Sequence, residues 1–100
     1  MFGTIAHMHP KSGHEAEVRA LADDWNERMR PLVPGHVLSL SGRAKDRPGD
    51  IVLVALMQDE PTYRALAAMP EQDAWFRRMA EHLDREPEWE DVEMEIDIQD

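Results

Sequence analysis

The feature that most restricts the fold is a run of seven apolar residues, Ile51–Met57, with no polar residue inside it. The loop before it, Asp46–Asp50, has a Pro-Gly turn signal at its centre. An apolar run of this length without alternation is typical of a strand covered on both faces, and such a strand lies inside its sheet. We therefore predict that Ile51–Met57 is a central strand and that the short loop joins it to a hairpin partner, His36–Arg43.

Two further segments read as strands. Phe2–His9 is short and ends before Pro10, which cannot donate to a strand ladder. Val92–Ile98 alternates strictly between apolar and acidic residues, which predicts a strand with one buried and one solvent-facing side. Because an acidic side resists pairing with other chains, we expect Val92–Ile98 at an edge of the sheet.

Two regions are predicted to be helical. Ser12–Glu15 has the capping-box pattern, so a helix is expected to begin there and to run to about Arg30. Acidic residues and a proline at Asp59–Pro61 open the second region, and Pro70 divides it. Apolar residues recur at helical spacing in both regions: Val18, Leu21, Trp25 and Met29 in the first, and Trp75, Phe76, Met79, Ala80 and Leu83 at the end of the second.

The resulting order is strand–helix–strand–strand–helix–strand. It predicts one α+β domain over residues 1–100, with a ferredoxin-like βαββαβ arrangement and a four-stranded antiparallel sheet. In that layout the first and third strands are central and the last is an edge. Two helices cover only one face of a sheet, whereas Ile51–Met57 is apolar on both. We therefore expect a homodimer, in which a second copy covers the other face.

The charge of the chain excludes several classes of partner. The 21 acidic and 11 basic side chains give a net charge of −10, so we expect neither nucleic acid nor an anionic membrane as a partner. The chain has no cysteine, and its first residues do not resemble a signal peptide. We therefore expect a cytoplasmic protein.

The chain also resembles a known family. The resemblance is carried by Pro10–Glu15, the Pro-Gly turn before His36, the apolar third strand, Tyr63–Leu66 and the pair Trp75-Phe76. Together these are similar to the antibiotic-biosynthesis-monooxygenase-like (ABM) domains of the dimeric α+β barrel superfamily. The resemblance implies a dimer of face-to-face sheets with one pocket per subunit between sheet and helices. It also implies cofactor-free oxidation of an aromatic compound.

The motif residues of that family are only partly present. In the oxygenases a helical Asn and Trp contribute to activity, and the haem-degrading members add a helical His. Pro61–Ala68 contains neither Asn nor Trp, and His82 lies several residues beyond the expected position. We therefore expect no haem and no other cofactor.

Three residues are candidates for catalysis. His7 and His9 lie two apart on one strand and so project from the same face, where imidazoles could supply a base near neutral pH. They are too few to predict a metal site. Tyr63 could supply a hydroxyl group to a ligand. The alternative for the two histidines is a pair near the strand end that faces solvent or the dimer partner.

Four residues are candidates for substrate binding. Trp25, Trp75 and Phe76 could line a pocket for a flat aromatic ligand, and the alternative is simple core packing. Because Trp75 and Phe76 are adjacent, only one of them can point squarely at the core. Arg28 could hold an anionic oxygen, and the alternative is a surface ion pair. We therefore predict a cofactor-independent monooxygenase of a small aromatic or polycyclic compound, or a binding module that uses the same pocket without chemistry.

Overall fold

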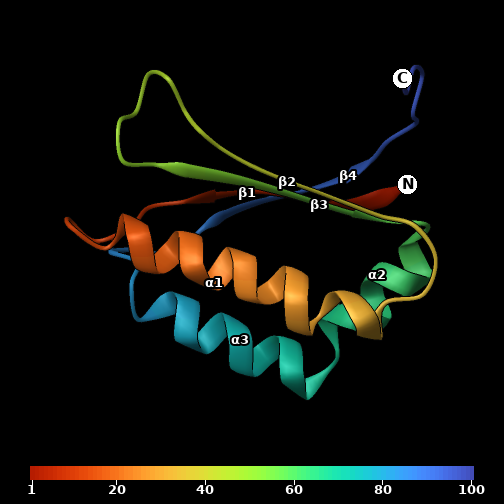
Figure 1. Ribbon diagram of the computed structural model, residues 1–100, viewed down its shortest axis with the longest axis horizontal. Coiled ribbons are helices and arrows are strands. Elements are labelled where there is room, and N and C mark those ends of the chain that lie inside the picture. The colour runs from red at the N-terminus through yellow and green to blue at the C-terminus, as the bar shows by residue number, and fades with distance from the viewer.

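The computed structural model describes residues 1–100, whose helices and strands form two layers (Figure 1). The elements follow the order β1 (Phe2–Met8), α1 (Glu15–Arg28), the 3₁₀ turn η1 (Arg30–Leu32), β2 (Val37–Arg43), β3 (Ile51–Met57), α2 (Glu60–Ala67), α3 (Pro70–Ala80) and β4 (Glu88–Glu93). This is the predicted ferredoxin-like order. No helix is long and apolar enough to cross a membrane.

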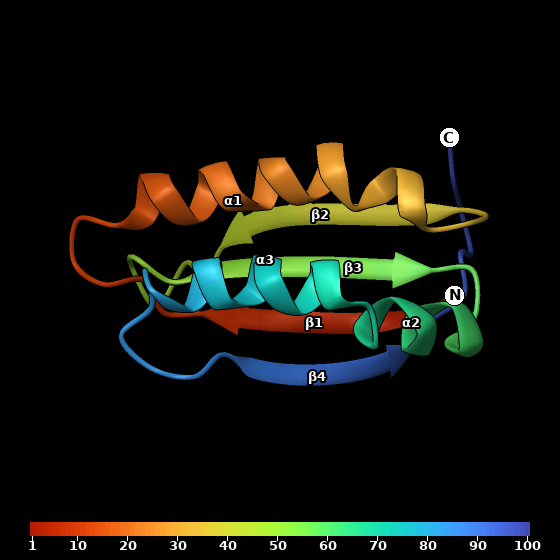
Figure 2. The same cartoon turned by 90° about the horizontal axis from the view of Figure 1, so that it is seen from below.

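The four strands form one antiparallel sheet in the order β2-β3-β1-β4, and all the helices lie on one side of it (Figure 2). The prediction that the first and third strands are central is confirmed, as is the edge position of the last. In the register, Ala6 of β1 lies between Leu53 of β3 and Trp89 of β4. The side chains of these three residues, and those at every second position along the same strands, point towards the helices. The side chains at the intervening positions point away.

Local sequence features explain where the helices begin and which side of α1 faces the sheet. α1 turns Val18, Leu21 and Trp25 towards the sheet at spacings of three and four residues. α2 begins after Asp59, whose carboxylate accepts a hydrogen bond from the Thr62 amide at 2.9 Å. Pro70 begins α3, so the predicted division of the second helical region is confirmed.

The predicted capping box at Ser12 is wrong. α1 begins at Glu15 with His14 at its N-cap, and no side chain caps it. Gly13 has a φ of 83° and takes part in a turn in which the His14 amide bonds to the Lys11 carbonyl at 2.9 Å. This turn separates Ser12 from the helix, because an N-cap residue must directly precede the first helical residue.

The predicted bounds of the last strand are also wrong. β4 spans Glu88–Glu93 and not Val92–Ile98. The cause is the length of its partner, since β4 pairs with Phe2 through His7 of β1 and Phe2 already lies opposite Glu93. The Met94 amide still bonds to the carbonyl of Met1, and no residue of β1 remains for those that follow.

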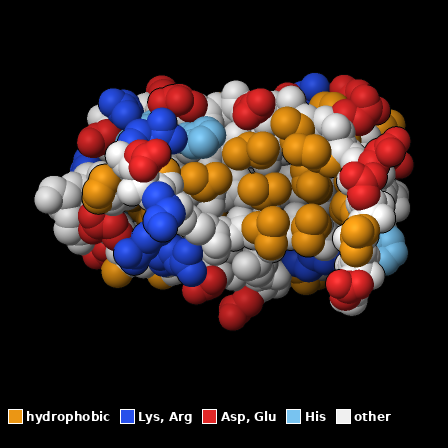
Figure 3. All heavy atoms as spheres, turned by 90° about the horizontal axis from the view of Figure 1, so that it is seen from above, with side chains coloured by type: hydrophobic (Ala, Val, Ile, Leu, Met, Phe, Trp, Pro, Cys, Tyr) orange, Lys and Arg blue, Asp and Glu red, His pale blue; other side chains and the backbone are white.

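The side of the sheet turned away from the helices, called the open face here, carries a continuous apolar patch (Figure 3). The register places on it the apolar side chains that alternate with those facing the helices, namely Ile5, Leu38, Leu40, Val52, Val54, Leu56 and Val92. Leu40 is 54% exposed. The apolar character of β3 on both faces is therefore an observed property of the fold.

Candidate functional site

A cavity of about 350 Å³ lies between the sheet and the helices. Its walls come from every strand and every α-helix, and most of the lining residues are apolar. They are Thr4, Ala6, Met8, Ala22, Trp25, Asn26, Ser39, Ser41, Leu53, Val54, Ala55, Met57, Tyr63, Leu66, Ala67, Gln72, Asp73, Trp75, Phe76 and Trp89. An apolar cleft with a few polar groups is the usual form of a small-molecule site.

Aromatic rings form a large part of the wall. All three tryptophans of the chain line the cavity, from α1, α3 and β4. Trp25 donates its indole N–H to the Gln72 side-chain oxygen at 2.8 Å, and Trp75 donates to the Leu21 carbonyl at 2.8 Å. Because these bonds hold both indoles across the α1–α3 contact, the rings are positioned before any ligand arrives.

Phe76 and Trp89 extend the aromatic wall to the outer side of the cavity. Their ring centroids are 5.5 Å apart with an angle of 58° between the planes. Trp75 is buried whereas Phe76 is half-buried, as their adjacency on α3 predicts. Trp89 is 47% exposed although it faces the helix layer. An indole left this open beside a cavity offers a stacking surface.

Tyr63 supplies a hydroxyl group at one end of the cavity. It donates a hydrogen bond to Asp91 at 3.2 Å, and Arg64 lies 3.5 Å from the other oxygen of that carboxylate. Burial raises the pKa of the Tyr63 phenol above its ordinary value, and the negative charge of Asp91 raises it further. Tyr63 therefore keeps its proton at neutral pH and acts as a donor.

The remaining polar groups are few. Gln72 uses its oxygen for Trp25, and no protein atom accepts from its amide nitrogen. Asp73 is the one carboxylate among the lining residues, and it pairs with Arg77 at 3.0 Å. Asn26, Ser39 and Ser41 are exposed residues that border the cavity. A ligand would thus meet amide and hydroxyl groups around an aromatic interior.

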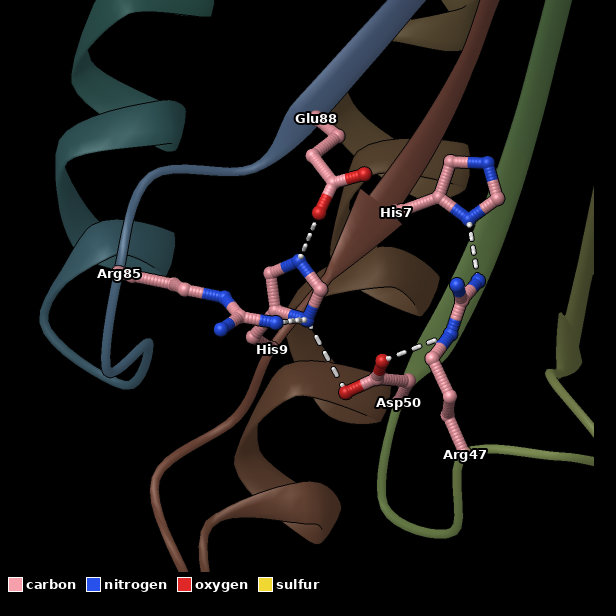
Figure 4. A network of polar contacts seen from close by, with 6 residues as sticks. All are labelled: His7, His9, Arg47, Asp50, Arg85 and Glu88. Carbon is pink, nitrogen blue, oxygen red and sulfur yellow. Dashed lines mark hydrogen bonds and ion pairs between the residues drawn. The ribbon is translucent and has the colours of Figure 1, made fainter.

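The two histidines expected to act in catalysis do not line this cavity. His9 is 4% exposed, with Nδ1 3.0 Å from Asp50 and Nε2 3.1 Å from Glu88 (Figure 4). His7 joins the same network through Arg47, whose Nε lies 3.3 Å from Oδ2 of Asp50 and whose Nη2 lies 3.4 Å from Nδ1 of His7. This network links the ends of β1, β3 and β4. Both histidines therefore lie outside the cavity, in contacts that hold strand ends together.

Arg28 also lies outside the cavity. Its side chain is 70% exposed and pairs with Asp24 at 2.9 Å, one helical turn earlier. The residue therefore sits on the solvent side of α1, and the structure does not bring it together with the residues that line the cavity. The site does bring together Tyr63, Trp25, Trp75 and Phe76.

Two functional candidates were missed by sequence reasoning. Trp89 was placed outside the last strand, although its position between acidic residues in Glu88–Glu90 was already a strand-like alternation. Gln72 carried no signal, because its contact with Trp25 joins residues 47 positions apart. No group of three or more His, Asp or Glu side chains has a geometry that could hold a metal ion.

The sequence matches no family model and no curated protein. Solved structures do match. The protein Rv0793 from Mycobacterium tuberculosis aligns with a TM-score of 0.80 at 17% identity, over 98% of each chain. A provisionally named antibiotic biosynthesis monooxygenase from Caulobacter crescentus has a TM-score of 0.82 at 16% identity, over 95% of this chain and 90% of its own.

A similarly named protein from Deinococcus radiodurans has a TM-score of 0.80 at 16% identity and covers 99% of this chain and 97% of its own. The overlap spans nearly all of each chain, so no large part of the shared architecture is missing here. At this identity the likeness concerns the fold and not the site residues. The chain is therefore a domain with the fold of the antibiotic biosynthesis monooxygenase-like proteins.

Proposed function

We propose that this protein binds a small, flat aromatic or polycyclic compound in the cavity between sheet and helices and oxygenates it without a bound cofactor. The observation that carries the proposal is the convergence of Trp25, Trp75, Phe76 and Trp89 on one cavity. Planar rings offer such a ligand stacking and edge contacts worth about 0.5–1.5 kcal/mol per aromatic pair. The names of the structural neighbours favour an oxygenase among the possible activities.

The size of the cavity supports a ligand of this kind. Its volume of about 350 Å³ lies near the lower end of the range for small-molecule sites, about 300–1,000 Å³. The interior polar groups, Tyr63 and Gln72, are hydrogen-bond donors. Donors of this kind suit a phenolic or keto oxygen on an otherwise apolar ligand.

The chemistry must draw its electrons from the substrate. A methylene group acidified by a neighbouring ketone can react as R₂CH₂ + O₂ → R₂C=O + H₂O, in which two C–H bonds break and dioxygen accepts four electrons. Gln72, whose amide nitrogen has no protein partner, would donate to the enolate oxygen formed when the first proton leaves, and Tyr63 would do so by turning its hydroxyl away from Asp91. Asp73 is the candidate acceptor for that proton, because it is the one carboxylate that lines the cavity.

One observation favours non-catalytic binding as a second candidate. Trp25, Trp75, Tyr63 and Asp73 all have protein partners for their polar atoms already. A site whose donors and carboxylate are engaged can bind an apolar ring without assisting a reaction.

The test uses the tryptophans as reporters, since all three line the cavity. Anthrone, which has an acidified methylene group, is titrated while tryptophan fluorescence and oxygen consumption are followed. Ala22→Phe fills the cavity from α1 and is expected to abolish quenching, whereas Ala20→Phe, on the exposed side of the same helix, is expected to retain it.

Asp73→Asn separates the two candidates. Under the oxygenase proposal it keeps quenching and lowers protein-dependent oxygen uptake at least about tenfold, while the exposed control Glu71→Gln keeps both. Quenching without oxygen uptake above the protein-free rate leaves the binding function and removes the oxygenase. Absence of Ala22-sensitive quenching by anthrone and by 1-naphthol removes both.

A further inference from the structure

A groove of about 260 Å³ adjoins the cavity, at the end of the helix layer where η1 and α2 lie (Figure 2). Its walls come from residues 32–34, from α2 and from Met69; they are mainly aliphatic, and none of them is aromatic. The cavity, in contrast, is lined by all three tryptophans of the chain. Two spaces of different chemistry therefore adjoin each other, one aromatic and one aliphatic.

The two spaces share one wall residue. One side of α2 and the residue two positions after it line the groove at spacings of three and four; these residues are Thr62, Ala65, Leu66 and Met69. The neighbouring side of the same helix lines the cavity with Tyr63, Leu66 and Ala67. Leu66 lies where the two sides meet, and it is the only residue that lines both spaces.

We propose that Leu66 determines which ligands the cavity accepts, by closing it towards the groove. Compact ring systems fit in the cavity, whereas an aromatic compound with an alkyl chain beside its oxygen is rejected. This inference rests on the proposed function, because it concerns the ligand of the same cavity. It goes beyond that function in naming the substrate class as rings without such a chain and in assigning the selection to one residue.

The burial of Leu66 makes it an effective wall. Its side chain is 4% exposed and belongs to the main hydrophobic core. A close-packed core leaves no free volume into which a leucine can withdraw, so a ligand chain cannot displace it without disturbing its neighbours. A ligand that needs the space of this side chain should therefore bind more weakly than one that stops short of it.

Tyr63 explains why a chain beside the ligand oxygen is the one that meets Leu66. The two residues are three positions apart on α2 and so lie next to each other along the helix. A ligand oxygen that accepts a hydrogen bond from the Tyr63 hydroxyl lies at this end of the cavity. A substituent on the adjacent ring carbon then extends towards Leu66, with the groove behind it.

The experiment measures dissociation constants by quenching of tryptophan fluorescence with 1-naphthol and its 2-ethyl, 2-butyl and 2-hexyl derivatives. In the starting protein we expect the 2-hexyl compound to bind at least about tenfold more weakly than 1-naphthol. Leu66→Ala opens the cavity to the groove. It is expected to keep the binding of 1-naphthol and to reverse the effect of the chain, with up to about a fourfold gain for each methylene group that enters the aliphatic groove.

A second variant covers the case in which Leu66→Ala does not fold. Leu66→Val removes less of the core and is expected to change the dependence on chain length in the same direction, by a smaller amount. The matched control is Leu83→Ala, because Leu83 is 6% exposed and lines neither space. It is expected to leave the dependence on chain length as in the starting protein.

Filling the groove tests where the chain lies. Ala65→Phe, added to Leu66→Ala, places a ring in the groove from α2 and is expected to remove the gain of the 2-hexyl compound. Ala68→Phe is the control for this change, because Ala68 is exposed and lines neither space. With Leu66→Ala it is expected to keep the gain.

The outcomes separate this inference from the proposed function. If 1-naphthol causes no quenching that Ala22→Phe abolishes, the cavity is not its binding site, and the proposed function and this inference lose that support together. If 1-naphthol binds there but the effect of the chain is the same with and without Leu66, only the inference is overturned. A gain in Leu66→Ala that persists with Ala65→Phe would also overturn it, because the chain would then lie outside the groove.

Discussion

The polar network around His9 allows a quantitative prediction about stability. His9 is 4% exposed and reaches two carboxylates with its two ring nitrogens, Asp50 at 3.0 Å and Glu88 at 3.1 Å. The distances are nearly equal, but the environments differ, because the Asp50 side chain is 16% exposed and that of Glu88 is 66% exposed. If His9 is removed, water can readily hydrogen-bond to the exposed Glu88 carboxylate in its place, but it reaches the largely buried Asp50 carboxylate poorly.

The magnitudes follow from these exposures. A hydrogen bond to a charged, largely buried group contributes about 1.5–3 kcal/mol, whereas an exposed ion pair contributes about 0–1 kcal/mol. His9→Ala removes both carboxylate contacts and the contact of Nδ1 with Arg85 at 3.1 Å, and it empties a buried position, so we expect it to lower the free energy of unfolding by about 2–4 kcal/mol. For a chain of 100 residues this corresponds to a fall in Tm of roughly 10–25 °C.

A double-mutant cycle measures the two contacts separately. Urea denaturation is followed by tryptophan fluorescence at one fixed protein concentration for His9→Ala, Asp50→Asn, Glu88→Gln and the two double variants. We expect a coupling free energy of about 1.5–3 kcal/mol between His9 and Asp50 and below about 1 kcal/mol between His9 and Glu88. Equal couplings, or a larger one with Glu88, would refute the reasoning from exposure.

Three further outcomes are expected. Tyr63 is the only tyrosine, so the absorbance of tyrosinate reports the titration of this residue alone. Because the pKa of its phenol is raised in the folded state, the titration midpoint should lie above 10, and the free energy of unfolding should fall as pH rises through that midpoint. A midpoint at or below 10 would contradict the burial of the phenol. Gly3→Ala places a Cβ atom 1.8 Å from the Ala55 carbonyl oxygen and should cost about 1–3 kcal/mol by urea denaturation, while Gly42→Ala, with no atom within 4 Å, should cost under about 1 kcal/mol. Met79→Ala, at a fully buried core position, should cost about 2–5 kcal/mol in the same assay, and a smaller cost would show that α3 closes the space.

The parts of the fold that the sequence predicts are those with a local cause. β3 is found at Ile51–Met57, as predicted. Seven consecutive apolar residues between a turn and the acidic start of a helix are typical of a central strand. Pro70 divides the second helical region for an equally local reason. The last strand is misplaced because Val92–Ile98 has the better alternation, whereas the length of β1 decides which residues find a partner.

The candidate site divides in the same way. Trp25 and Trp75 lie on helix stripes that any sheet-covering helix turns inwards, and their place in the cavity follows from spacing. The environment of His9 is set by residues 41 and 79 positions away, which no spacing rule brings together. Trp89 enters the cavity through its register opposite Ala6, so the error in the bounds of β4 concealed it.

The edge strand β2 borders both the cavity and the open face. Its sequence Leu38-Ser39-Leu40-Ser41 turns leucines to the open face and serines to the helix side. A sheet with one solvated face and one packed face would require the opposite pattern. The leucines can lie outward at little cost only if another surface covers them, and the serines can lie inward only beside a space that holds water or a ligand. Exchanging the leucines and serines at these positions would therefore suit a solvated outer face better, while it would remove part of the apolar patch of the open face and the polar border of the cavity.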